Sequence, residues 1–226
     1  MVEMSKFFLR LTLIFLMASC SNSPEMETGI IKTFQLLKST INQSNASKTF
    51  LNARNLLSRE QIDEANTPVL FVELGSGQNG TLIPYPGRGI GQTWLGADGA
   101  TVTLERGVLK ASRGMGDDLM GSYSSMPLWT KIENSSGPYT RKISHLSGNN
   151  KLTTRSLQCE VQKNNKRELL KIWDVQFSVI KYTENCNHNS TVITNTFYVD
   201  EKEIVRKSFQ YHSETLGYII TERLDR

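Results

Sequence analysis

Alternation of apolar and polar side chains in the second half of the chain is the feature that most restricts the fold. From Trp173 to Val179 every second residue is apolar, and the residues between them, such as Gln176, are polar. A period of two fits an extended strand with one buried face and does not fit an amphipathic helix. The polar run Lys163–Lys166 just before this segment predicts the turn that leads into it.

Further short strand-like segments follow one another at intervals of about 8–12 residues. The Asp98-Gly99 and Arg106-Gly107 pairs are turn signals, and the second predicts a hairpin between its neighbouring strands. The other predicted strands are residues 69–74, 101–104, 108–111, 191–199, 204–211 and 218–223. This spacing predicts a mainly β domain, an antiparallel β-barrel-like or strongly curved sheet.

Two helical segments are predicted ahead of the strands. Between residues 28 and 41, Ile30, Phe34 and Leu37 recur at spacings of three and four. A second short helix is predicted from 47 to 59. We therefore expect one β-rich domain over 28–226, with a helical start at 28–59 and strands at 67–226.

Residues 1–19 have the layout of a secretory signal peptide. Lys6 and Arg10 precede a short apolar run, which ends in small residues just before Cys20. The run is shorter than the roughly 20 apolar residues that span a bilayer. The junction Leu16-Met17-Ala18-Ser19-Cys20 resembles the bacterial lipobox, which implies cleavage after Ser19 and acylation of Cys20. Ordinary cleavage near Ala18 is the alternative.

Acylation of Cys20 would hold the mature chain on a membrane. One acyl chain anchors only marginally, but bacterial lipoproteins carry two or three. Ser21, where an Asp would favour retention in the inner membrane, predicts the periplasmic face of the outer membrane. Residues 20–27 then form a tether. The chain has 26 basic and 22 acidic residues, and removal of 1–19 leaves 24 − 21 = +3, too small an excess to predict nucleic-acid binding.

Three cysteines are present, at positions 20, 159 and 186. With Cys20 assigned to the anchor, Cys159 and Cys186 remain as a pair in an oxidising compartment. A bridge would close a loop of about 27 residues and stabilise the fold by about 3 kcal/mol, and two buried free thiols are the alternative. A hairpin turning at 163–166 would not set these cysteines opposite each other, so sheet curvature or a loop would have to bring them together.

Motifs for cofactors and catalysis are weak. Gly75–Gly80 reads G-x-G-x-x-G, but Pro84 and Pro86 follow where a dinucleotide fold needs a helix, so a flexible connection is expected. Asp117 and Asp118 are adjacent, which predicts a loop or cap role. The three histidines, His145, His188 and His212, lack metal-ligand spacing and are expected at the surface. We therefore predict no catalytic residue, metal or cofactor.

Two blocks of sequence resemble the YjbF/GfcB family of group 4 capsule and exopolysaccharide lipoproteins. The first runs from Thr93 to Met120 and the second from Asn195 to Tyr211. The chain departs from the family at Tyr211-His212-Ser213, where a second Trp and a Pro are usual. The residues that carry the resemblance are Trp94, Asp98, Gly99, Gly107, Gly114, Asp117, Asp118 and Leu119 in the first block, and Asp200, Ser208 and Gln210 in the second.

The resemblance implies a periplasmic β-barrel-like fold and a role in producing or exporting extracellular polysaccharide. It also implies an outer-membrane β-barrel or a periplasmic export protein as partner, and it carries over no catalytic residue. The leading hypothesis is a non-enzymatic accessory lipoprotein that binds such a partner or the polysaccharide. The alternative is a lipid or glycolipid carrier whose apolar cavity is lined by Phe177, Met115 and Met120. A polysaccharide hydrolase or lyase would need two facing carboxylates, which the sequence does not reveal.

Overall fold

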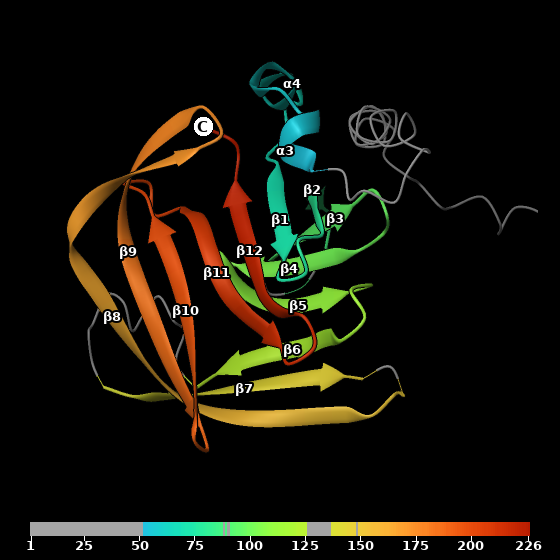
Figure 1. Cartoon of the computed structure of the whole chain (residues 1–226), viewed down its shortest axis with the longest axis vertical. Helices are drawn as coiled ribbons and strands as arrows, with labels where there is room; N and C mark the ends of the chain where they lie inside the picture. The colour runs from blue at the N-terminus through green and yellow to red at the C-terminus, as the bar shows by residue number, and fades with distance from the viewer. Residues whose placement is uncertain (1–51, 88, 90, 126–136, 148) are drawn as a thin grey trace, which may run out of the picture. The chain divides into compact units, whose positions relative to one another are not determined.

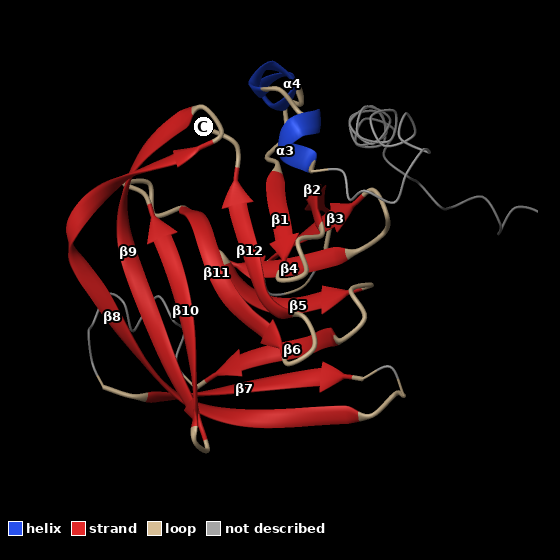
Figure 2. Cartoon of the chain, viewed as in Figure 1, coloured by secondary structure: helices blue, strands red, loops and turns tan. Residues whose placement is uncertain are grey.

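The structure is a computed structural model that describes residues 52–226 except 88, 90, 126–136 and 148. The predicted signal peptide, Cys20, the tether and the helix at 28–41 lie outside this part. Within it, no helix is long and apolar enough to cross a bilayer. The elements, shown in Figures 1 and 2, are α3 (Ala53–Leu56), α4 (Arg59–Glu64), β1 (Leu70–Leu74), β2 (Asn79–Tyr85), β3 (Gln92–Gly96), β4 (Thr101–Glu105), β5 (Val108–Arg113), β6 (Asp118–Ser124), β7 (Tyr139–Leu146), β8 (Leu152–Ile172), β9 (Val175–His188), β10 (Thr191–Val199), β11 (Val205–Ser213) and β12 (Gly217–Arg223).

The twelve strands form one antiparallel sheet in the order β5-β4-β3-β2-β1-β12-β11-β10-β9-β8-β7-β6. Except for β5 and β6, strands that are consecutive in sequence pair with each other, and β12 returns to pair with β1. The two end strands, β5 and β6, are consecutive in the chain and lie side by side, so the sheet curls into a nearly closed barrel (Figure 1). The predicted mainly β, barrel-like fold is confirmed.

Most of the predicted strands are present. The hairpin between β4 and β5 turns through Arg106 and Gly107, which have φ values of 47° and 85°. Two positive φ angles match the right-handed twist of the flanking strands, and glycine adopts them without strain. The segments predicted at 191–199, 204–211 and 218–223 correspond to β10, β11 and β12.

The turn predicted at Lys163–Lys166 is wrong. Those residues lie inside β8, where the register shifts from Lys163↔Tyr182 to Arg167↔Ile180. The turn comes at Trp173, whose φ is 50°, and Asp174. The indole of Trp173 packs edge-on against Phe71 at 5.4 Å between ring centroids. This tertiary contact stabilises a conformation that the alternating pattern does not predict.

The structure has strands at five places where the sequence pattern predicted none, namely β2, β3, β6, β7 and β8. The glycine-rich stretch after β1 is a tight hairpin, since the Gly77 amide donates to the Leu74 carbonyl. Asn79 and Gly80, predicted to lie in a flexible connection, already pair with β1. Pro84 is tolerated in β2 because the ladder with β1 ends at Leu82, so a missing N–H breaks no pairing there.

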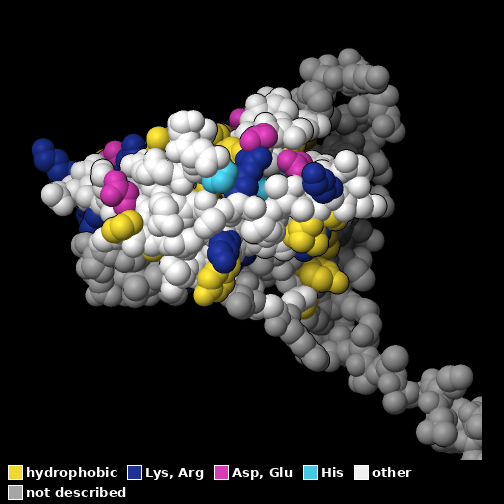
Figure 3. Space-filling model, turned by 90° about the horizontal axis from the view of Figure 1, so that it is seen from below, with side chains coloured by type: hydrophobic (Ala, Val, Ile, Leu, Met, Phe, Trp, Pro, Cys, Tyr) yellow, Lys and Arg dark blue, Asp and Glu magenta, His cyan; other side chains and the backbone are white. Residues whose placement is uncertain are grey.

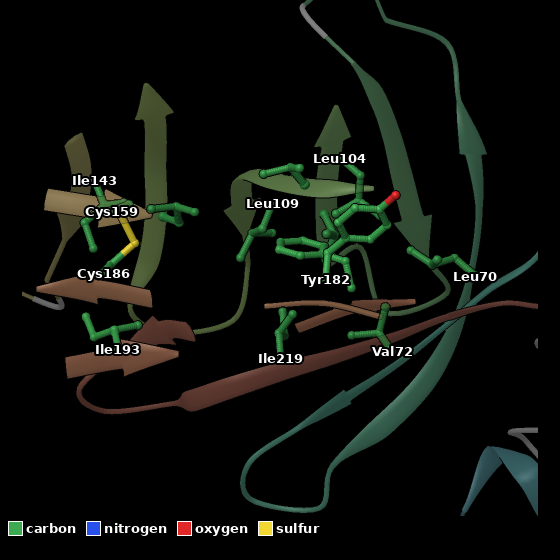
Figure 4. Packing of buried hydrophobic residues seen from close by; sticks show 14 of the residues in the cluster. Leu70, Val72, Leu104, Leu109, Ile143, Cys159, Tyr182, Cys186, Ile193 and Ile219 are labelled. Atoms are coloured by element: carbon green, nitrogen blue, oxygen red, sulfur yellow. A yellow bond between two sulfur atoms is a disulfide. The ribbon is translucent and has the colours of Figure 1, made fainter. Parts of the chain in front are cut away.

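The barrel interior is filled by interlocking side chains from both halves of the sheet (Figure 4). Val102, Leu109, Phe197 and Ile219 are completely buried there. Close packing of this kind is the main stabilising contribution of the fold. Because apolar side chains fill the interior, the candidate functional groups are the polar side chains among them and those on the outer surface.

A second, smaller apolar cluster joins the helices to the sheet. Ile62 of α4 and Phe71 of β1 belong to it, together with Trp173 at the β8–β9 turn. Ser58 begins α4 with a capping box, because its hydroxyl accepts from the Gln61 amide and the Gln61 side chain accepts from the Ser58 amide. In the described part of the predicted 47–59 helix, α3 is helical, and α4 begins at the last predicted residue, Arg59, and runs on to Glu64.

Candidate functional site

The two sequence blocks that carry the family resemblance meet inside the barrel. The inward side of β11 is polar along its length, and Arg206, Ser208, Gln210 and His212 are each at most 1% exposed. Buried polar side chains need partners, since an unpaired group costs about 1–3 kcal/mol. These residues find many of their partners across the interior on β5, the last strand of one half of the sheet.

Gln210 is the centre of this contact. Its Oε1 accepts from the Leu109 amide at 2.8 Å, and its Nε2 donates to the Gly107 carbonyl at 2.9 Å and to Ser208 Oγ at 2.9 Å. Ser208 Oγ is in turn 2.6 Å from Thr221 Oγ1. One amide side chain therefore satisfies the Leu109 amide of β5 and the Gly107 carbonyl in the turn before it, at an edge of β5 that forms no ladder.

A second contact joins His212 to the same strand. His212 Nε2 is hydrogen-bonded to Ser112 Oγ at 2.7 Å, and this hydroxyl also accepts from the Leu119 amide at 3.0 Å. His145 Nε2 donates to the His212 carbonyl at 2.5 Å. The prediction that His145 and His212 are surface residues is wrong, because both are buried on inward faces, and His188 is half-buried.

The environment of His212 keeps its imidazole neutral. Burial, with a smaller contribution from His145, lowers the pKa of His212 to about 4, although Asp117 and Asp118 act in the opposite direction. Its Nδ1 has no hydrogen-bond partner among the described residues. A neutral histidine beside a serine has the composition of a nucleophile and its base. Ser112 is only 1% exposed, however, so its hydroxyl serves the sheet rather than a substrate.

A buried ion pair lies beneath the strands β7, β9 and β10. Arg141 Nη1 is 2.7 Å from Glu184 Oε2, and Arg141 also donates to Ser122 Oγ and to the Leu109 carbonyl. Tyr139 and Asn195 both donate to the Glu184 carboxylate. Burial, followed by the adjacent carboxylate, raises the pKa of Tyr139, so its hydroxyl remains a donor. With three donors around Glu184, the charge is compensated inside the protein.

Cys159 and Cys186 form the predicted disulfide. They are direct cross-strand partners of β8 and β9, with Cα atoms 4.0 Å apart. The hairpin turns at Trp173 instead of at 163–166, and the register shift between Lys163 and Arg167 then sets Cys159 opposite Cys186, so a local irregularity in β8 brings the two cysteines together. The two sulfurs and a Glu184 oxygen lie within 4.8 Å of one another, but the sulfurs are bonded to each other and do not provide thiolate ligands.

Three acidic motif residues, Asp98, Asp118 and Asp200, accept hydrogen bonds from backbone amides in turns. Asp118 accepts from the Gly114 and Met115 amides, which agrees with the predicted cap role. Asp98 accepts from the Ala100 amide after the turn at Gly99, which has a φ of 87°. Asp200 accepts from the amides of Lys202 and Ile204 and pairs with Arg206 at 2.6 Å.

The remaining motif residues are also structural. Trp94 is 2% exposed, and the guanidinium of Arg223 lies over its ring at 4.8 Å. Leu119 is buried in the core beside the β5–β6 turn. Among the described residues, the motif thus forms turns, caps and the contact between β11 and β5.

The three side chains predicted to line a lipid cavity are not brought together. Phe177 packs in the smaller cluster and stacks with Arg206 at 4.3 Å. Met115 packs against the barrel core, whereas Met120 is 37% exposed. An apolar ligand site built from these residues is therefore not supported.

The fold and interior define a class of protein: a nearly closed, twelve-stranded antiparallel barrel with a filled core and a buried polar seam. The family model described as "Group 4 capsule polysaccharide lipoprotein gfcB, YjbF" matches residues 32–224. The chain belongs to this family.

A solved structure supports the fold. The crystal structure of the hypothetical lipoprotein YmcC from Escherichia coli (K12) matches with a TM-score of 0.63 and 17% sequence identity. The match covers 85% of this chain and 95% of that chain. No curated protein matches the sequence.

Proposed function

We propose that this protein is a non-enzymatic accessory lipoprotein in the production or export of capsule or exopolysaccharide, held at the periplasmic face of the outer membrane through Cys20. The family match over residues 32–224 is the observation that carries the proposal. The lipobox-like sequence ending at Cys20 supports the anchor, and Ser21 supports the outer membrane.

The interior of the barrel supports a binding role over catalysis. The Ser112 hydroxyl, the Nε2 atoms of His145 and His212 and the Glu184 carboxylate all bond groups inside the protein. Such a network stabilises a rigid sheet, which presents its outer surface in a constant shape. Anchoring confines that surface to the membrane plane, where even weak contacts with a second envelope component become effective.

The proposal is tested by isolating the native acylated protein from outer membranes with its bound components. We expect recovery of an outer-membrane β-barrel protein, a periplasmic export protein or polysaccharide, and loss of surface polysaccharide when the gene is deleted. Normal surface polysaccharide in the deletion strain would contradict the proposed role.

The anchor has its own test. Mass spectrometry of the mature N-terminus should show acylated Cys20. The Cys20→Ser variant should keep its signal peptide, and the membrane fraction should contain less of the processed protein than in the wild type. A Cys20→Ser protein that is processed and membrane-bound like the wild type would contradict lipid anchoring.

A further inference from the structure

The outward face of strands β7 to β10 carries mostly uncharged polar side chains. Tyr139, Cys159 and Cys186 point into the barrel, so their sequence neighbours point outward. Thr140 of β7, Gln158 of β8 and Asn187 of β9 are directly opposite one another in the register. These three residues form one row of hydroxyl and amide groups across the sheet.

A neighbouring row continues the pattern onto β10, where Asn185 of β9 is opposite Thr194. We call these five residues, together with Tyr123 of β6, the uncharged face. Two hydrogen bonds hold its side chains in place: Gln158 Nε2 donates to Thr140 Oγ1 at 3.2 Å, and Thr194 Oγ1 donates to Asn185 Oδ1 at 2.9 Å. Each row follows a sheet with strands about 4.8 Å apart, similar to the length of one sugar residue in a chain.

Tyr123 provides an apolar ring at the border of this face. It is 67% exposed and is paired with Lys142 of β7, which also points outward. Glu160 of β8 is opposite Asn185 in the second row, and its charge is opposite to that of Lys142, so the face has little net charge. Seen from below, where β7 and the first part of β8 lie in Figure 1, the surface is mostly uncharged polar side chains and backbone (Figure 3).

The support beneath the face is rigid. The Cys159–Cys186 disulfide joins β8 to β9 directly under Gln158 and Asn187, which are adjacent to the cysteines in sequence. The Arg141–Glu184 ion pair lies on the same inward side of β7 and β9. A preorganised array loses less conformational entropy when it binds a ligand.

We propose that the uncharged face binds a polysaccharide chain. Sugars present many hydroxyl groups and an apolar ring face, which match an array of amides and hydroxyls bordered by an exposed tyrosine. The inference rests on the proposed function and adds a binding surface to it. The interaction depends on hydrogen bonds and stacking, so it is insensitive to ionic strength.

The test uses the full mature chain in detergent and, as probe, capsular polysaccharide extracted from the cells that make the protein. Affinity electrophoresis should show that the polysaccharide slows migration of the wild type. Tyr123→Ala and the double variant Gln158→Ala/Asn187→Ala should each weaken binding by about tenfold. Raising the salt concentration to roughly 0.5 M should change the affinity less than twofold.

Tyr85→Ala is the matched control, because Tyr85 is 49% exposed on β2, outside the uncharged face. Its affinity should equal that of the wild type, and circular dichroism should show that every variant is folded. Equal losses in Tyr85→Ala and Tyr123→Ala, or no retardation of the wild type, would overturn the inference. So would Tyr123-dependent binding of an outer-membrane protein without polysaccharide.

The two proposals fail separately. Loss of surface polysaccharide in the deletion strain, with no binding by the purified protein, would leave the proposed function intact and remove the uncharged face from it. Binding at the uncharged face with normal polysaccharide export in the deletion strain would confirm the surface and contradict the role in export.

Discussion

The barrel is closed at two places, and they are built in different ways. Between β1 and β12, the first and last strands, a continuous antiparallel ladder runs from Leu70↔Arg223 to Leu74↔Ile219. Between β5 and β6, which are consecutive in the chain, no ladder forms. There the Arg113 guanidinium donates to the Leu119 and Met120 carbonyls, and the interior side chains of Gln210 and Arg141 bond the Leu109 amide and carbonyl of β5.

The difference shows why particular side chains matter more at one closure than at the other. A ladder uses backbone groups that every residue except proline has, so many sequences can form it. The β5–β6 closure instead needs particular donors and acceptors: Gln210 for the Leu109 amide, Arg141 for the Leu109 carbonyl and Ser112 for the Leu119 amide. Substitution at this closure leaves buried backbone groups unpaired.

The largest expected effect comes from Arg141→Met. The variant keeps much of the side-chain volume but leaves the Glu184 carboxylate buried without its cation, which should lower the free energy of unfolding by about 3–5 kcal/mol. Urea denaturation measures the change. Arg167→Met, at an exposed position of β8, is the control and should stay within about 0.5 kcal/mol of the wild type. Similar midpoints for the two variants would show that the ion pair is dispensable.

Acidification should weaken the same closure through His212. Its pKa is about 4 in the folded protein and about 6.5 in the unfolded chain, so the unfolded chain binds the proton first as the pH falls. The contribution of neutral His212 is present above pH 6.5 and is lost between about pH 6.5 and 4, by roughly 3 kcal/mol.

The measurement is the free energy of unfolding as a function of pH. His212→Gln removes the titrating group and should flatten the profile over this window. His188→Gln, at the half-buried histidine outside the closure, should keep the wild-type slope. An unchanged slope in His212→Gln would assign the pH dependence to other groups.

Gln210→Leu should lower the free energy of unfolding by about 2–3 kcal/mol, because the Leu109 amide and the Gly107 carbonyl lose their partner inside the barrel. Hydrogen exchange of the Leu109 amide should accelerate more than that of amides in the β1–β12 ladder. Gln176→Leu, on the exposed side of β9, is the matched control. If hydrogen exchange accelerated equally at the β5–β6 closure and in the β1–β12 ladder, Gln210 would have no special role at the β5–β6 closure.

The smallest effect separates two glycines with the same backbone conformation. Gly99 and Gly107 have φ values of 87° and 85°, but only a Cβ at position 107 would meet Val205, at 2.4 Å. Both Gly→Ala variants are strained by positive φ, and Gly107→Ala should lose about 1 kcal/mol more. Thermal or urea unfolding of the pair gives this difference. Equal losses would show that Val205 moves aside without cost.

Several features follow from local sequence. The period-two pattern and the turn pairs Asp98-Gly99 and Arg106-Gly107 predict the β fold and the hairpin of β4 and β5, because alternation and positive φ are properties of neighbouring residues. The strands at 79–85 and 92–96 could not be predicted in this way. Pro84 and the glycines weaken the strand pattern in the sequence, and pairing with the neighbouring strands stabilises these segments.

The chain by itself determined the class of fold, the cysteines available for a bridge and the two blocks that resemble the family. Only the tertiary structure decided that β8 and β9 turn at Trp173 and that their register shifts after Lys163, which together make Cys159 and Cys186 direct partners. It also decided that the polar side of β11 points inward. Both depend on register and on contacts between distant strands, such as Gln210 with Leu109. Local sequence periodicity shows which residues share a face, but the strands packed against that face decide what it contacts.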